Sequence, residues 1–139
     1  MSIKSLAHVC IKTTDLAQTT AFYCGALGME KAFNFTRKGE VIGFYLKASQ
    51  NTFIEFFLVD RIEPTTPNHA LSHFCLETDS IEALRQKVLD KGYEPTEVKM
   101  GSDNSLQFWV NDPNGISFEF HQYTAQSSQF TDKDVEVNW

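Results

Sequence analysis

LAHVCIKTT (residues 6–14) and LSHFCLETD (residues 71–79) follow one pattern: Leu, a small residue, His, an apolar residue, Cys, an aliphatic residue, a charged residue and Thr. The two histidines, His8 and His73, lie 65 residues apart. Self-similarity at a fixed spacing is the sequence signature of a fold built from repeated units. The pattern therefore predicts a chain made of two halves with the same local structure.

A helical pattern follows each of these stretches. The first runs from Asp15 to Gly28 and the second from Ser80 to Gly92, with apolar residues three or four positions apart. Asp15 is the expected N-cap of the first helix, and Ser80 or Asp79 that of the second. Gly28 and Gly92 stand where glycine commonly follows a helix end. Each half thus predicts one helix after its first strand.

Strand patterns come next in both halves, because runs of aliphatic and aromatic residues are bounded by turn residues. The matching strands are 40–48 with 105–112, 52–57 with 116–121, and a weaker pair, 30–36 with 93–99. Each half therefore predicts the order strand, helix and three strands. The fold class that we predict is α+β, built from two βαβββ modules.

The repeat also predicts how the chain is organised. We expect residues 1–139 to form a single domain. Its predicted parts are a first module at 3–59, a linker with two prolines at 60–69, a second module at 70–123 and a polar tail at 124–139. The tail breaks the repeat, and we expect it to wrap the surface or a partner subunit, or to be loosely held.

The composition excludes several classes of partner. Hydrophobic residues make up 42% of the chain and charged residues 22%, which is ordinary for a soluble protein. The net charge is −6 and no basic run occurs, which argues against nucleic acid and anionic membranes as partners. No apolar stretch approaches the roughly 18 residues that span a bilayer. Three cysteines without CxxC spacing predict free thiols, and we expect a cytoplasmic protein.

Four residues at equivalent positions of the repeat have side chains that bind metals. Each half keeps one histidine in its first strand (His8, His73) and one glutamate in its last (Glu55, Glu119). Both glutamates interrupt runs of apolar residues, and a carboxylate buried there is costly without a partner. Taken singly, such a histidine is more often a satisfied core or surface residue, and such a glutamate more often faces water. Together, two imidazoles and two carboxylates suit one divalent first-row cation, Zn or Ni more than Ca or Mg.

These residues and their surroundings resemble a known family. His8 followed by TTDLAQTTAFYCGALGM, Glu55 in FIEFF, His73 in LSHFCLETD, and DPNGISFEF containing Glu119 are similar to the vicinal oxygen chelate superfamily. That superfamily groups glyoxalase I, bleomycin-resistance proteins and extradiol dioxygenases, and the resemblance covers residues 3 to about 123. It implies two curved mixed sheets that flank a metal cleft. It also implies a small-molecule substrate and a homodimer, in which modules of neighbouring chains often pair.

The glyoxalase I-like branch implies roles for the four residues. There His8, Glu55, His73 and Glu119 would bind one divalent ion, with Zn or Ni favoured and Fe, Co or Mn also compatible. The ion would act as a Lewis acid on vicinal oxygens and stabilise an enediolate. Glu119 is the first candidate for the catalytic base and Glu55 the second. The function that we predict is a metal-dependent glyoxalase-like lyase or isomerase.

His121 is a further catalytic candidate. It follows Glu119 by two residues, so both side chains point to the same face of a strand. His121 could hydrogen-bond the substrate or shuttle a proton. The alternative is a histidine at the strand end that faces solvent.

The sequence departs from the family pattern at two positions. Bacterial glyoxalase I enzymes carry an Arg four residues after the first His and an Asn four residues after the first Glu, and both help to hold glutathione. Lys12 and Val59 occupy these positions here, so a substrate other than lactoylglutathione fits better. Two alternatives stay open: an Fe(II)-dependent ring-cleaving dioxygenase, and a metal-free binding protein of the bleomycin-resistance kind.

Overall fold

The computed structural model describes residues 2–63, 66 and 68–137. The chain divides into two units, of which the first comprises Met1–Thr65 with Pro113–Gly115 and the second comprises Thr66–Asp112 with Ile116–Trp139. Each unit contains one sheet, and the two are described in turn below.

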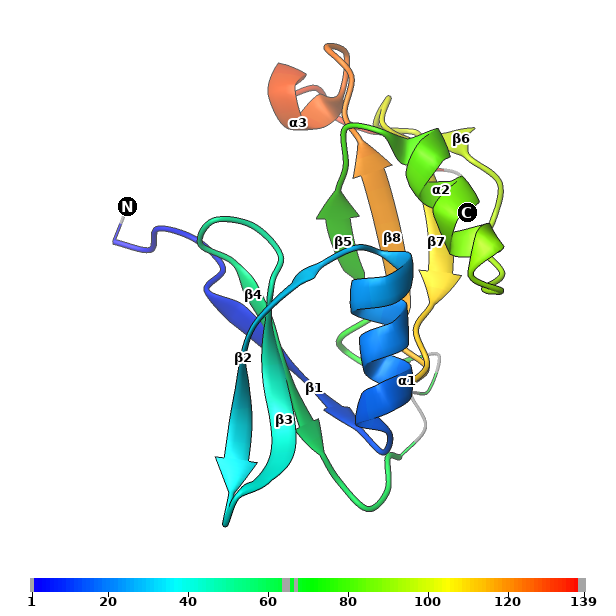
Figure 1. Cartoon of the computed structure of the whole chain (residues 1–139). Helices are drawn as coiled ribbons and strands as arrows, with labels where there is room; N and C mark the ends of the chain where they lie inside the picture. Colours follow the sequence, from blue (N-terminus) through cyan, green and yellow to red (C-terminus); the bar gives the residue numbers. More distant parts are fainter. Residues whose placement is uncertain (1, 64–65, 67, 138–139) are drawn as a thin grey trace. The chain divides into compact units, whose positions relative to one another are not determined.

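The first unit contains a four-stranded mixed sheet in the order β1-β4-β3-β2 (Figure 1). Its strands are β1 (His8–Thr13), β2 (Glu30–Arg37), β3 (Glu40–Lys47) and β4 (Phe53–Leu58). β1 runs parallel to β4, whereas β2–β3 and β3–β4 are antiparallel pairs. One face of β4 places Ile54 and Phe56 in the core, so Glu55 between them points to the opposite face.

The helix of this unit is α1 (Leu16–Thr20), which continues as a π-helical segment (Ala21–Ala26). The predicted N-cap is confirmed, because the carboxylate of Asp15 accepts hydrogen bonds from the N–H groups of Ala17 and Gln18, both at 2.9 Å. The helical segment packs on β4 through Tyr23, whose ring centre lies 4.7 Å from that of Phe56. Gly28 follows it with φ of 76°, as its place after the helix predicts.

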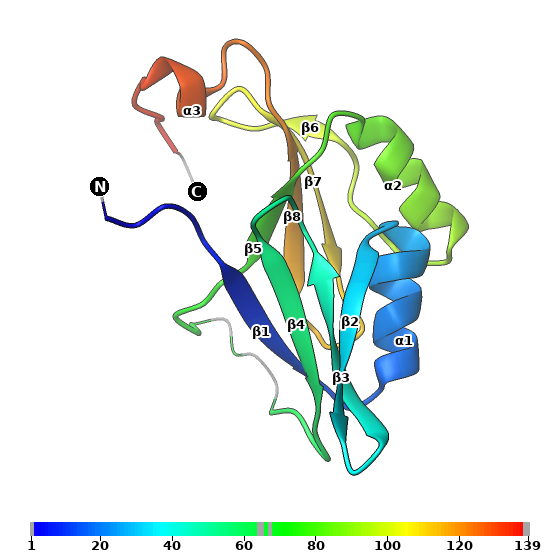
Figure 2. The same ribbon diagram turned by 60° about the vertical axis from the view of Figure 1, so that its left-hand side comes forward.

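The second unit repeats this arrangement in the order β5-β8-β7-β6. Its strands are β5 (Phe74–Glu77), β6 (Lys99–Met100), β7 (Leu106–Asn111) and β8 (Ser117–Gln122). β5 runs parallel to β8, and α2 (Ile81–Asp90) packs against β7 and β8 (Figure 2). Ser80 holds the N-cap position without a side-chain cap. The N–H of Ile81 instead donates to the Gln122 side chain at 2.9 Å.

The predicted fold class is confirmed: the protein is α+β, with two four-stranded mixed sheets that are curled but not closed. The strand predicted at 93–99 is wrong, since the structure has only Lys99–Met100 there. Pro95 has no N–H to donate to a ladder. The N–H of its neighbour Thr96 donates to the backbone oxygen of Trp109 at 2.8 Å. The Thr96 hydroxyl oxygen accepts from the backbone N–H of Trp109 at 2.8 Å. This local bonding replaces a regular strand.

The first part of the predicted tail is ordered on the second unit. It forms α3 (Ser128–Thr131), whose first N–H donates to the backbone oxygen of Asp103 at 2.8 Å. The buried Ser127 hydroxyl accepts a hydrogen bond from Ser105 at 3.0 Å. The tail therefore wraps the surface of this unit, as one of the sequence-based alternatives predicts.

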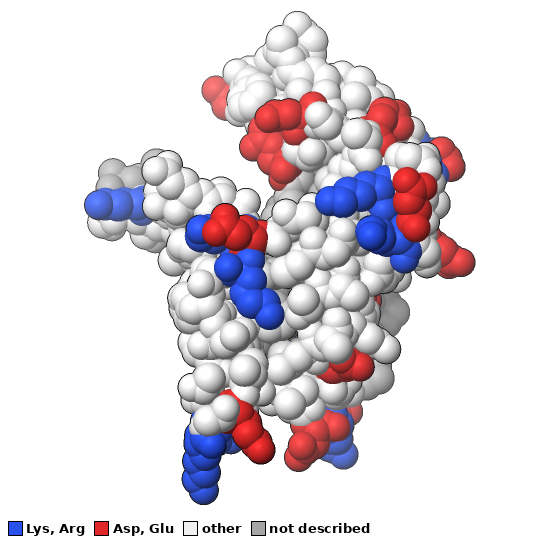
Figure 3. All heavy atoms as spheres, viewed as in Figure 1, with Lys and Arg blue, Asp and Glu red and all other residues white. Residues whose placement is uncertain are grey.

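Two surface properties bear on possible partners. Among the described residues, no helix has the length and apolar character needed to cross a membrane. Basic and acidic side chains are intermixed on the face drawn in Figure 3, and the chain as a whole carries a net charge of −6.

Candidate functional site

In the first unit, the parallel pair β1–β4 brings His8 and Glu55 together. Cys10 is the direct partner of Glu55 in the register of this pair, and His8 precedes Cys10 by two residues on the same face. The Nε2 atom of His8 lies 3.6 Å from Oε1 of Glu55. The side chain of Glu55 is 17% exposed, against 46% for His8. This pair is therefore half-open to solvent.

Aromatic side chains cover the face on which Glu55 lies. Tyr45 on β3 is the cross-strand partner of Glu55. The Tyr45 ring stacks between those of Phe33 and Phe53, with ring centres 4.8 and 5.2 Å away, and Phe35 stacks on Phe57 at 4.6 Å. A carboxylate set among rings needs a hydrogen-bonding or cationic partner. Among the described residues, His8 is the ion-pair partner that the structure provides.

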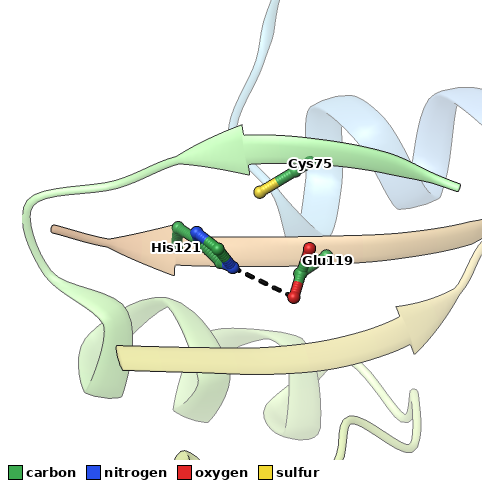
Figure 4. Close-up of side chains that lie close together, drawn as sticks. All are labelled: Cys75, Glu119 and His121. Carbon is green, nitrogen blue, oxygen red and sulfur yellow. Dashed lines mark ion pairs between the residues drawn. The ribbon is translucent and has the colours of Figure 1, made fainter. Parts of the chain in front are cut away.

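In the second unit, Glu119 lies between two histidines. His73, just before β5, places Nε2 3.3 Å from Oε2 of Glu119. His121 on β8 places Nε2 3.0 Å from Oε1 (Figure 4). Glu119 and His121 are both buried, each with 8% of its surface exposed. The prediction that these two residues share a strand face is confirmed, and the alternative of a solvent-facing His121 is wrong.

The imidazole of His121 is buried, and neither ring nitrogen has a hydrogen bond to any residue that the structure describes. Its Nδ1 lies 3.8 Å from Oδ2 of Asp103, which is too long for a hydrogen bond. Gln129 of α3 donates to that Asp103 oxygen at 2.6 Å, and the Ser105 hydroxyl donates to it at 2.9 Å. Burial acts to raise the pKa of Asp103, but these hydrogen bonds outweigh it, so the pKa lies below the ordinary value. An anionic Asp103 therefore faces His121.

The two cysteines of the repeat lie beside the two glutamates. Cys75 is the direct register partner of Glu119, as Cys10 is of Glu55, and both thiols are on exposed residues. Desolvation, and then the neighbouring Glu119 carboxylate, raise the pKa of Cys75 to about 12. The same two causes, with Glu55 as the carboxylate, raise the pKa of Cys10. Without a bound cation, both thiols are therefore protonated at neutral pH.

A cavity of about 480 Å³ opens over the glutamate of the second unit. The ring of Trp109, the cross-strand partner of Glu119, lies edge-on to His73 with centres 4.7 Å apart. The described residues that line the cavity are Ser72, His73, Ser102, Asp103, Gln107, Trp109, Glu119, His121, Val135 and Val137. Most of these residues have polar side chains, but apolar atoms, including those of Trp109 and the two tail valines, make up most of the exposed lining. The volume suits a small metabolite.

The described residues fit a divalent metal ion in their donor chemistry. Neutral imidazoles and carboxylates are ligands for first-row cations, and Glu119 is a buried carboxylate that would gain from one. The two ring nitrogens of His121 are buried and make no hydrogen bond to a described residue. They therefore also indicate a missing ligand such as a metal ion. Each unit thus assembles one of the two predicted His–Glu pairs.

Sequence reasoning missed several residues of this site. Trp109 matches Tyr45 in the repeat, and that match could have identified it as the neighbour of Glu119. Asp103 lies in a loop and Val135 in the tail, where no periodic pattern places a side chain. Cys75, which the sequence predicted only as a free thiol, is exposed and lies directly opposite Glu119.

Comparisons with known proteins agree with this fold. The family model described as the Glyoxalase/Bleomycin resistance protein/Dioxygenase superfamily matches residues 5–120. A protein of Synechocystis sp. named "Probable lactoylglutathione lyase" is 30% identical, over 87% of this chain and 97% of its own. A glyoxalase family protein from Enterococcus faecalis superposes with a TM-score of 0.73 at 24% identity, covering 87% of this chain and 99% of its own. An antibiotic binding protein from Streptomyces sp. CB03234 superposes with a TM-score of 0.70 at 18% identity, covering 89% and 99%.

Proposed function

Because this chain belongs to the Glyoxalase/Bleomycin resistance protein/Dioxygenase superfamily, we propose that it is a metal-dependent enzyme with glyoxalase-like lyase or isomerase activity on a small oxygenated metabolite. The observation that carries the proposal is the repeated pairing of a histidine with a glutamate. His8 lies 3.6 Å from Glu55, and His73 lies 3.3 Å from Glu119, in the same place relative to a parallel strand pair of each unit. A protein that only bound an apolar ligand would have little use for two desolvated carboxylates.

In this proposal, His8, Glu55, His73 and Glu119 hold one divalent cation, whether they come from one chain or from two chains of a homodimer. Nitrogen and oxygen donors favour Zn or Ni, and Fe, Co and Mn remain compatible. When bound, such a cation would polarise substrate oxygens as a Lewis acid. The homodimer and the cytoplasmic location stay predictions.

The side chains of the second unit would handle the proton. Glu119 is the first candidate for the base, because its carboxylate is desolvated and borders the cavity. His121, with Nε2 at 3.0 Å from Glu119, would hold or pass on a proton taken up there. Trp109 and the tail valines would exclude water from the substrate. Glu55 is the second candidate for the base.

The substrate differs, in our proposal, from the one in the name of the Synechocystis relative. Lys12 is exposed on β1 and Val59 follows β4, and neither supplies the Arg or Asn side chain that the glyoxalase I pattern uses to hold glutathione. We expect no conversion of lactoylglutathione above background. We also expect turnover of another small molecule that carries two adjacent oxygens.

A second candidate function is binding of a planar apolar molecule without catalysis. It is favoured by the stacked rings of Phe33, Tyr45 and Phe53 on the face of Glu55, since Phe33 is half exposed. The dioxygenase alternative would use three ligands and Fe(II), and its activity would disappear without oxygen. Glu55 favours the four-ligand enzyme over both alternatives.

The test is the metal content of the purified protein and of two variants. We expect Glu55→Ala and Glu119→Ala each to bind at least about one divalent ion per chain fewer than the wild type. Glu97→Ala removes an exposed glutamate of the second unit and serves as the matched control, with metal content unchanged. Full metal content in the Glu55 and Glu119 variants would contradict the four-ligand site. A wild type without metal would favour the binding protein.

A further inference from the structure

The two halves of the repeat differ at one position next to their glutamates. On the strand face that carries Glu55, the residue two positions later is Phe57, whereas His121 occupies that position after Glu119. Both halves keep a cysteine directly opposite the glutamate in the parallel strand pair. At this position the second unit therefore has a metal-binding side chain and the first does not.

This additional histidine completes a cluster of three donors. One ligand atom each of Cys75, Glu119 and His121 lies within 4.8 Å of the others, on the neighbouring strands β5 and β8 (Figure 4). Glu119 faces His73 with Oε2 and His121 with Oε1, so its two oxygens point to different histidines.

His121 gives independent evidence for a ligand at this place. It is more than nine-tenths buried, and within the described part of the chain neither of its ring nitrogens makes a hydrogen bond. Buried polar atoms are nearly always satisfied, so such an imidazole indicates a missing partner such as an ion. His121 Nε2 and Glu119 Oε1 form an ion-pair contact at 3.0 Å without hydrogen-bond geometry, and a cation bound by both atoms would satisfy the two groups.

We propose that Cys75, Glu119 and His121 form a metal site contained within the second unit, which takes a thiophilic divalent cation such as Zn²⁺ or Co²⁺. Sulfur, nitrogen and oxygen donors in a set of three leave one position of a tetrahedral ion open. Binding would release the proton of the Cys75 thiol to solvent, so that sulfur coordinates as thiolate. Two of the three donors lie outside the four-residue set proposed above, so this site does not require His8 or Glu55.

The test uses Co²⁺ added to the metal-free, thiol-reduced protein. A thiolate bound to Co²⁺ gives an intense near-ultraviolet charge-transfer absorption that nitrogen and oxygen donors do not give. We expect this absorption in the wild type and in Cys10→Ser, which removes the equivalent thiol of the first unit, and we expect its loss in Cys75→Ser. The double variant His8→Ala/Glu55→Ala should keep it, even if catalysis is lost.

Zn²⁺ affinity, measured by competition with a chromophoric chelator, gives a second readout. Cys75→Ser and His121→Gln should weaken it at least as much as the roughly 10- to 100-fold that removing a supporting partner costs. Circular dichroism checks that His121→Gln is folded. Cys75 is exposed, so Cys75→Ser should not disturb the fold. Absent thiolate absorption in the wild type, or equal loss in Cys10→Ser, would overturn the site. Loss of all metal in the double variant would overturn its independence and leave only the four-residue set.

Discussion

Replacing Glu119 with Gln separates the stability of the fold from metal binding. Glu119 has 8% of its surface exposed and lies 3.0 Å from His121 and 3.3 Å from His73. Gln has nearly the same size, and its amide can still contact both imidazoles. The substitution removes only the charge, whose burial costs free energy. Without metal, we therefore expect a free energy of unfolding that is unchanged or raised by about 1 kcal/mol.

With metal, the expected effect has the opposite sign. A cation at one hundred times its dissociation constant stabilises the wild type by about 2.7 kcal/mol. For a chain of this size, that corresponds to a rise of about 10 °C in the melting temperature. If Gln weakens binding by about 100-fold, the same cation concentration equals the dissociation constant. The stabilisation then falls to about 0.4 kcal/mol, or less than about 2 °C.

Scanning calorimetry with and without Zn²⁺ measures both effects. Glu94→Gln, which changes an exposed glutamate of the same unit, should melt like the wild type under both conditions. The reasoning is refuted if Glu119→Gln gains as much from Zn²⁺ as the wild type. It is also refuted if the metal-free variant is several kcal/mol less stable than the wild type.

Two further predictions concern the helix cap and the thiol. Asp15→Ala removes the acceptor for the N–H groups of Ala17 and Gln18, and should lower the free energy of unfolding in urea by about 1 kcal/mol, with no change for Asp15→Asn. A thiol whose pKa is about 12 holds roughly a thousandfold less thiolate below pH 9 than one at the ordinary value of 9.0. Cys75 of the metal-free protein should therefore react with iodoacetamide much more slowly than free cysteine, and Glu119→Gln should speed this reaction. Mass spectrometry of timed samples would measure both rates. Labelling of Cys75 in the wild type as fast as that of free cysteine would contradict the prediction.

Local patterns in the sequence predicted the repeated architecture correctly. Gly28 and Gly92 follow the two helices with φ of 76° and 85°, and Asp15 caps the first helix, because each of these roles depends on neighbouring residues alone. The prediction of a strand at 93–99 was wrong because of two residues in that segment itself. Pro95 cannot join a ladder, and the hydrogen bonds of Thr96 go to Trp109.

The candidate site, too, was predicted only in part from the sequence. Alternation along a strand showed that Glu119 and His121 share a face, but it could not show whether that face meets solvent or protein. The tertiary structure decided this, since the loop at Asp103 and the tail residues Val135 and Val137 line the cavity over it. Such coverage comes from segments distant in sequence, and no local pattern specifies it.

By itself, the sequence determined the two βαβββ modules and the residue types at equivalent positions, because strand and helix periods and helix caps are set by neighbours along the chain. Only the tertiary structure decided that Cys75 lies directly opposite Glu119 and that the imidazole of His121 is buried with no hydrogen bond to a described residue. β5 and β8 meet as a parallel pair although about 40 residues separate them, through a connection that no local rule describes. The register of that pair, rather than the composition of either strand, assembles the donors of the second unit.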